Sequence, residues 1–115
     1  MEKAKTFGTV QEFMDNNRVW TDQTFGKLNA VAALKHLRKE VNETIEAIEL
    51  QQPEEHIREE FADMFLLLLN ACSKHGLTFH ALYNNAERKM IINRARKWGQ
   101  VNNEGFIEHV KEEKA

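Results

Sequence analysis

The chain has 115 residues, of which 42% are hydrophobic and 30% charged, and its net charge is −2. This balance excludes the strongly basic surface that nucleic-acid binding requires, and no apolar run approaches the ~20 residues that cross a bilayer. Cys72 is the only cysteine, so no internal disulfide can form, and the N-terminus lacks the apolar core of a secretory signal. We therefore expect a cytoplasmic protein that binds neither nucleic acid nor membrane.

The first three apolar patterns along the chain have the spacing of amphipathic helices. The first begins after Thr9, a candidate N-cap, and the polar stretch 21–26 that follows it predicts a loop. The second covers residues 27–51. The third, residues 53–74, starts with a proline and ends before a His-Gly pair. The second pattern carries one apolar stripe, consisting of Leu34, Leu37, Val41, Ile45 and Ile48.

A fourth helix is expected over residues 79–98, with Thr78 as its N-cap. The tail, residues 100–115, is polar, and a short helix is one interpretation of it. The sequence thus predicts an all-α bundle of about four helices in a single domain, residues 1–115, with segments 1–8 and 100–115 at the periphery. The side chains of the fourth helix expected to face inward are Leu82, Ala86, Met90 and Ile91.

The third helix is apolar on nearly every face, because Phe61 precedes an unbroken apolar run over residues 64–69. A helix that is apolar all round is buried on all sides. A chain of this size supplies little cover for such a helix. We therefore predict a homo-oligomer, either a dimer or a tetramer.

Two pairs of carboxylates each lie one helical turn apart, Glu40 with Glu43 and Glu60 with Asp63. The short link between the two helices predicts antiparallel neighbours, so the pairs can face each other. Four converging carboxylates repel one another unless cations neutralise them, and oxygen ligands on a rigid scaffold favour Mg²⁺ or Mn²⁺. The alternative is a set of solvated helix faces. Against it, Asp63 has apolar neighbours on both sides, and we do not expect it to be free in water.

The sequence argues against two other kinds of metal site. A di-iron carboxylate bundle uses a Glu-x-x-His pattern on two helices, and no glutamate here has a histidine at that position. Cys72 and His75 form a Cys-x-x-His pair on one helix. A zinc site requires a second pair of ligands, so a buried cysteine with a histidine at the helix end is the better interpretation.

The two acid pairs, in this order and spacing, resemble the MazG-type all-α nucleoside triphosphate pyrophosphohydrolases. Further blocks are similar to the branch described as dATP/dGTP diphosphohydrolases, which is common in phages and prophages. One departure bears on substrate choice: the branch often has Gly-Pro before its "LKHL" block, and this chain reads "LNAVAALKHL". The blocks that carry the resemblance are "WTDQTFG" (20–26), "LKHLRKE" (34–40), "EEFADM" (59–64), "ERKMIINRARKWG" (87–99) and "EHVKE" (108–112).

The resemblance implies hydrolysis of a nucleoside triphosphate, a deoxypurine one in this branch, to the monophosphate and pyrophosphate. It implies Mg²⁺ held by Glu40, Glu43, Glu60 and Asp63, with Mn²⁺ as the alternative ion. Attack on the α phosphate by a metal-activated water needs a proton acceptor, and Glu43, which lies furthest from the apolar stripe, is the candidate. Two alternatives stay open: a pyrimidine-specific relative acting on dCTP or dUTP, and a helical interaction module without catalysis.

The family's Lys and Asn that contact phosphate or order the metal site correspond to Lys89 and Asn93, which lie one turn apart. Arg96 continues that side, and its guanidinium can hold a phosphate oxygen pair. The competing interpretation of the three is a solvated basic helix end that the helix dipole favours.

Trp20 and Phe25 are candidates for stacking on the base, although a tryptophan that packs the loop on the bundle explains the pattern equally well. His36, one turn before the first acid pair, is a candidate contact to base, sugar or phosphate, or a support for the acids. Asp22 and Gln23 are further candidates for reading the base edge.

Overall fold

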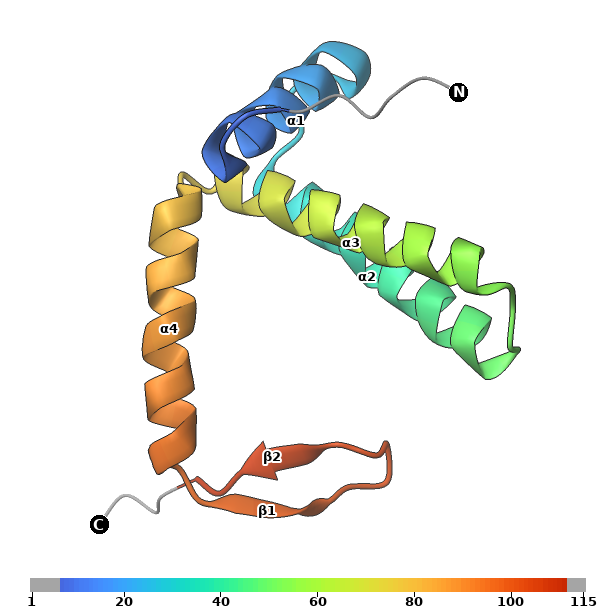
Figure 1. Ribbon diagram of the computed structural model, residues 1–115, viewed down its shortest axis with the longest axis vertical. Helices are drawn as coiled ribbons and strands as arrows, with labels where there is room; N and C mark the ends of the chain where they lie inside the picture. The colour runs from blue at the N-terminus through green and yellow to red at the C-terminus, as the bar shows by residue number, and fades with distance from the viewer. Residues whose placement is uncertain (1–6, 112–115) are drawn as a thin grey trace. The chain divides into compact units, whose positions relative to one another are not determined.

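The computed structural model describes residues 7–111. The described residues form two compact units, the first ending at Leu82 and the second beginning at Tyr83. The predicted all-α fold of about four helices is confirmed, with a short hairpin added near the C-terminus (Figure 1). Parts of the segments predicted as peripheral, residues 1–6 and 112–115, lie outside the described residues. The elements are α1 (Val10–Phe25), α2 (Ala30–Glu49), α3 (Glu54–Lys74), α4 (Phe79–Ala95), β1 (Trp98–Val101) and β2 (Ile107–His109).

Helix α1 begins as predicted at Thr9, whose hydroxyl accepts a hydrogen bond from the backbone N–H of Glu12 at 3.1 Å in a capping box. The prediction of a loop over residues 21–26 is wrong, because α1 continues to Phe25. In this last part of α1, Thr21 and Asp22 contact side chains of α3, and the sequence alone does not reveal these contacts. Gly26, with a φ of 84°, ends the helix, and only a residue without Cβ adopts this conformation readily.

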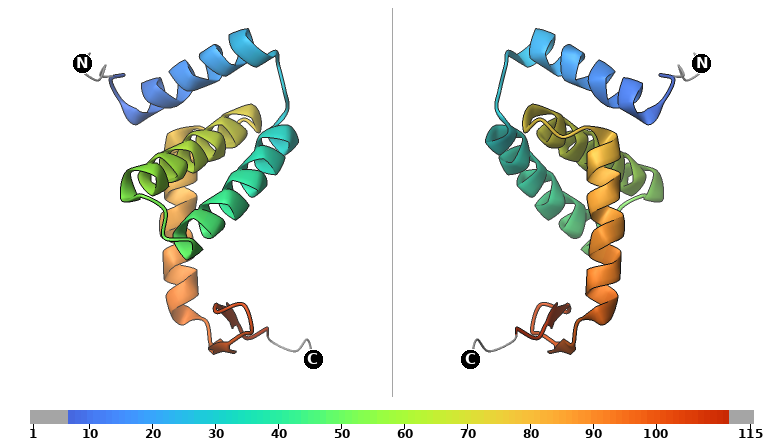
Figure 2. Two further views of the ribbon diagram at one scale, coloured as in Figure 1. Left: turned by 90° about the vertical axis from the view of Figure 1, so that its right-hand side faces the viewer. Right: turned by 90° about the vertical axis from the view of Figure 1, so that its left-hand side faces the viewer.

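Helices α2 and α3 lie side by side, joined by the short link 50–53 (Figures 1 and 2). Asn29 caps α2 by accepting a hydrogen bond from the N–H of Ala32 at 2.8 Å. Pro53 precedes α3, and His75 and Gly76 close it, as predicted. The short link makes the helices antiparallel, so the first turns of α3 lie beside the C-terminal half of α2.

The core of the first unit is small and lies where α1, the end of α3 and the start of α4 meet. Met14 and Leu69 are fully buried there, and Cys72 packs against them. A hydrogen bond of 2.7 Å from the Phe79 N–H to the Gln11 side chain joins the start of α4 to α1. Burial raises the pKa of the Cys72 thiol, which is consistent with a packing role.

Much of the apolar surface stays uncovered in the single chain. Four of the five stripe residues on α2 are exposed, as are Phe61 and Phe65 on α3. Ala86, Met90 and Ile91, which were predicted to face inward, are exposed residues of the second unit. Leu82 does pack against the core. Among residues 7–111, no helix has the length and apolarity to cross a membrane.

The second unit contains most of α4 and the antiparallel pair β1–β2. Thr78 caps α4 as predicted, accepting a hydrogen bond from the Ala81 N–H at 3.1 Å. The interpretation of the tail as a short helix is wrong. Asn102 accepts hydrogen bonds from the N–H groups of Glu104 and Phe106 and so closes a turn that also contains Gly105 at a φ of 93°. Apolar residues on both sides of an Asn-to-Gly turn are the usual signal of a hairpin.

Candidate active site

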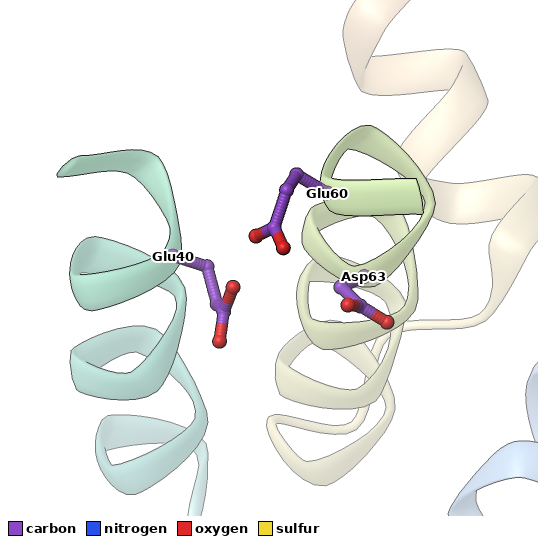
Figure 3. A group of neighbouring side chains, drawn as sticks. All are labelled: Glu40, Glu60 and Asp63. Atoms are coloured by element: carbon purple, nitrogen blue, oxygen red, sulfur yellow. The ribbon is translucent and has the colours of Figure 1, made fainter. Parts of the chain in front are cut away.

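Three of the four predicted acids converge between α2 and α3. Figure 3 shows Glu40 on α2 and Glu60 on α3 pointing into the space between the helices, with Asp63 one turn further along α3. Each residue offers a carboxylate oxygen, and these oxygens lie within 4.8 Å of one another. Among residues 7–111 this is the one group of three or more potential metal ligands. Like charges at such distances are costly unless a cation or protons neutralise them.

The donor set of this acidic cluster, defined as Glu40, Glu60 and Asp63, fits a divalent cation. One oxygen of Glu60, Oε2, is buried and has no hydrogen-bond partner among the described residues. A buried carboxylate oxygen without a donor is unfavourable by itself, and a metal ion would satisfy it. An all-oxygen donor set favours Mg²⁺ or Mn²⁺ over zinc or copper.

Each glutamate of the cluster has a histidine one turn before it on the same helix. The Nε2 atom of His36 lies 3.5 Å from Glu40 Oε1, and Nε2 of His56 lies 3.8 Å from Glu60 Oε1. The imidazoles can hold one oxygen of each carboxylate and leave the other for a ligand. His36 was a candidate from the sequence. His56 was not, although it too lies one turn before an acid.

Glu43 does not belong to the cluster in this structure. Its carboxylate lies 3.6 Å from Lys39 Nζ, and its side chain is 47% exposed. An exposed ion pair of this kind contributes little energy, so it does not fix the rotamer of Glu43. The role of Glu43 as a ligand or proton acceptor stays a prediction. Asp63, expected to be shielded from water, is exposed in the single chain.

A hollow of about 440 Å³ adjoins the acidic cluster within the first unit. Glu40 and Asp63 line it together with Trp20, Phe25 and His36, three residues that the sequence analysis proposed for substrate contacts. The rings of Trp20 and Phe25 meet edge to face with their centroids 5.4 Å apart. A hollow of this size, largely apolar with a few polar groups, is typical of small-molecule sites.

The structure adds polar residues to this hollow that the sequence analysis did not assign, among them Asn70 and Lys74 from the second half of α3. The signal was available for Asn70, because a polar side chain directly after an unbroken apolar run is expected to be buried and partnered. No sequence signal pointed to Lys74.

Lys74 ties the end of α1 and the α1–α2 connection to α3. Its side chain is only 5% exposed, and Nζ donates to Asp22 Oδ1 at 2.6 Å and to the carbonyl of Leu28. The hydrogen bond from Lys74, helped by the charge of Lys74 and then of Arg18, lowers the pKa of the Asp22 carboxyl below its ordinary value. In the structure without a ligand, Asp22 is therefore an ion-pair partner of Lys74. Its contact with the edge of a base stays a prediction.

Replacing Asp22 by Asn is expected to lower the melting temperature at pH 7, because it leaves a buried ammonium without its carboxylate. Since the pKa of Asp22 is lowered by folding, the stabilisation is present above the unfolded-state value of about 3.9 and is lost as the pH falls through the folded-state value. Melting curves of both proteins from pH 7 down to pH 2 should therefore converge at the acid end.

Lys74→Met gives the matching variant for this ion pair. The double variant should lose little more than the more damaging single change, because both remove the same interaction. Equal melting temperatures of Asp22→Asn and the unaltered protein at pH 7 would contradict the assignment.

The predicted phosphate-binding residues belong to the second unit. Lys89 and Asn93 lie on α4, and Arg96 follows the last residue of the helix. The guanidinium of Arg96 donates to Asn93 Oδ1 at 3.2 Å, and the indole N–H of Trp98 donates to the Asn93 carbonyl at 2.9 Å. These contacts hold Asn93 and Arg96 together, and their role toward phosphate stays a prediction.

The helical fold, with an acidic cluster beside an apolar hollow, has the features of the MazG-like class of pyrophosphohydrolases. More particularly, the model of the dATP/dGTP pyrophosphohydrolase family matches residues 13–115, and the chain belongs to that family. It is therefore an enzyme, a pyrophosphohydrolase, and the resemblance seen in the sequence is confirmed.

A solved structure described as the cyanophage S-2L MazG-like pyrophosphohydrolase bound to dGDP and three catalytic Mn²⁺ ions per active site is similar in fold, with a TM-score of 0.67. The sequence identity is 23% over 90% of this chain and 99% of the other. No curated protein sequence matches the chain.

Proposed function

We propose that the protein hydrolyses a deoxypurine nucleoside triphosphate, dATP or dGTP, to the monophosphate and pyrophosphate. Water adds to the α phosphorus, the bond from that phosphorus to the bridging oxygen breaks, and pyrophosphate leaves. The observation that carries the proposal is the acidic cluster, with oxygens within 4.8 Å of one another, at the edge of a hollow that Trp20 and Phe25 line. The family's description, and the dGDP and Mn²⁺ bound to the similar cyanophage enzyme, support it.

The cofactor we propose is Mg²⁺, with Mn²⁺ as the alternative, held by Glu40, Glu60 and Asp63. Glu43 becomes a fourth ligand if its exposed side chain turns away from Lys39. When bound, a divalent ion neutralises phosphate charge and lowers the pKa of a water molecule that can attack. The buried Oε2 of Glu60 supports this assignment, because no side chain or backbone group within residues 7–111 donates to it.

Several residues of the chain have proposed roles toward the substrate. Glu43, an exposed carboxylate, is the proton acceptor for the attacking water. Trp20 and Phe25 hold the base by stacking and edge contacts, and His36 keeps one oxygen of Glu40 in place. The residues proposed to bind the phosphate oxygens and compensate the charge of the leaving pyrophosphate are Lys89, Asn93 and Arg96.

The test is a product analysis. The purified protein is incubated with each dNTP and NTP, with Mg²⁺, Mn²⁺ or EDTA, and the products are separated by ion exchange. We expect dAMP or dGMP with equimolar pyrophosphate, only with a metal, and strongly reduced by Glu43→Gln. The exposed Glu46→Gln on the same helix is the control.

Other results would exclude the proposal. Turnover of dCTP or dUTP alone would favour the pyrimidine-specific alternative. No turnover, together with a melting temperature that Mg²⁺ and Mn²⁺ do not change, would favour the non-catalytic interaction module.

We also propose that residues 1–115 act as one catalytic domain and that the protein is a homo-oligomer, a dimer or a tetramer. Large apolar side chains on α2 and α3, such as Ile45 and Phe65, are exposed. This supports an interface between copies, since a second copy that covers them would remove apolar surface from water. The cytoplasmic location expected from the sequence stays a prediction.

Light scattering should give at least twice the chain mass of 13.4 kDa at micromolar concentration. Ile45→Asp should lower that mass, because it places a charge in the interface. Gln52→Asp, which adds the same charge to an exposed position in the link after α2, should not. A monomeric unaltered protein would contradict the proposal.

A further inference from the structure

Asn70 is a buried polar residue at the edge of the hollow. It is 7% exposed and follows the apolar run of α3. Its side chain makes one hydrogen bond among residues 7–111, a 3.3 Å contact between Oδ1 and the hydroxyl of Thr21 on α1. A carboxamide has two donors and an acceptor, so one end of this buried amide is left for a ligand. Asn70 and Thr21 both line the hollow, together with Trp20 and Phe25.

The Thr21 hydroxyl gives the Asn70 amide two possible orientations. The hydroxyl also lies 2.9 Å from the Arg18 carbonyl, to which a helical threonine commonly donates. A hydroxyl has one proton, so it can donate to only one of these oxygens at a time. When it donates to Arg18, it can accept a hydrogen bond from the amide NH₂, and Asn70 turns its oxygen to the hollow. When it donates to Asn70 Oδ1, the amide turns its NH₂ to the hollow.

These two orientations match the two common purines. Adenine carries an amino group at carbon 6, which is a donor, and guanine carries an oxygen there, which is an acceptor. An amide that presents oxygen pairs with the first, and an amide that presents NH₂ pairs with the second. The cost of the exchange is small, because Thr21 keeps one partner in either state.

We propose that Asn70 reads the substituent at carbon 6 of the purine, and that Thr21 lets its amide turn so that one site accepts both 6-amino and 6-oxo purines. The proposal rests on the proposed function, since it assumes a purine nucleotide in this hollow. On this proposal, the residues that select the base lie on α1 and on the second half of α3, and the carboxylates Glu60 and Asp63 lie on the first half of α3.

The decisive variant is Asn70→Asp. A carboxylate only accepts hydrogen bonds, so it suits the 6-amino group and opposes the 6-oxo group. The ratio of kcat/KM for dGTP over that for dATP should fall about 10- to 100-fold, the range expected for one base contact. Asn70→Leu should lower both values by similar factors. Asn16→Asp, the same change at an exposed position of α1 outside this hollow, is the control and should leave the ratio unchanged.

Should the variants fail to fold, the contact between Asn70 and the substituent at carbon 6 can be tested with the unaltered protein and a modified substrate. The deoxynucleoside triphosphate of unsubstituted purine, with hydrogen at carbon 6, leaves the amide unpaired. Its kcat/KM should be at least about tenfold below those of dATP and dGTP, which should lie within about tenfold of each other. Binding of dADP and dGDP in Mn²⁺, measured by calorimetry, gives the same comparison without turnover.

The outcomes distinguish failure of the proposed role of Asn70 from failure of the proposed function. An unchanged dGTP-to-dATP ratio in Asn70→Asp, or full activity on the unsubstituted purine, overturns the role of Asn70 and leaves the proposed function standing. Failure of the unaltered protein to bind or hydrolyse any purine nucleotide, while Mn²⁺ still raises its melting temperature, overturns both.

Discussion

Replacing Glu60 by Gln is expected to lower kcat/KM for the best nucleotide about 1,000-fold. Several kcal/mol of transition-state stabilisation depend on a bound ion, and each ~1.4 kcal/mol is a factor of ten in rate. Within the described part of the chain, Oε2 of Glu60 is buried and has no hydrogen-bond partner. Its negative charge is therefore expected to contribute directly to binding the metal ion. The assay is pyrophosphate release at saturating Mg²⁺ and at saturating Mn²⁺.

Glu59→Gln is the matched control for Glu60→Gln, because it makes the same change one residue earlier, at an exposed position of α3. A second measurement separates lost chemistry from lost fold. Without metal, Glu60→Gln should melt no lower than the unaltered protein, since it removes repulsion among close carboxylates. With Mn²⁺, its melting temperature should rise less. Substantial turnover by Glu60→Gln, or an equal loss in Glu59→Gln, would refute the metal site.

Leu69→Ala is expected to be the most destabilising single core substitution, at about 3 kcal/mol. Leu69 is fully buried and meets Met14 of α1, and half-buried side chains at the start of α4 pack against the same cluster. The loss is a large share of the roughly 5–15 kcal/mol that stabilises a domain. A small core has few other contacts to compensate.

Urea unfolding followed by circular dichroism measures this loss. All samples need the same protein concentration, because oligomer stability depends on it. Leu50→Ala, the same change at a side chain that is 63% exposed, should cost less than about 0.5 kcal/mol. Equal unfolding midpoints for the two variants would show that the core lies elsewhere.

The helix boundaries that local chemistry determines were predictable. Thr9 and Thr78 cap helices and Gly76 ends one, because each acts on its own backbone within a few residues. The extension of α1 through residues 21–25 was not predictable, since the α3 partners of Thr21 and Asp22 lie far along the chain. The hairpin was missed although its Asn-to-Gly turn and flanking apolar residues were visible in the sequence.

The acids of the site were predictable from spacing, because residues one turn apart share a helix face and Glu40, Glu60 and Asp63 do converge. Glu43 was predicted by the same spacing but does not join the other three acids. Helical periodicity places the Cα of a residue and does not determine the rotamer of its side chain. The burial of Asn70 could have been predicted from its place after the apolar run, but its partner, Thr21, lies on a helix distant in sequence and could not.

Helix α3 carries the two kinds of site residue on separate stretches, with Glu60 and Asp63 in its first half and Asn70 and Lys74 in its second. A substitution at Asn70 leaves Glu60 and Asp63 in place, because about two helical turns separate Asp63 from Asn70. If Asn70 and the acids act as proposed, substitutions around Asn70 should change nucleotide preference without removing a metal ligand.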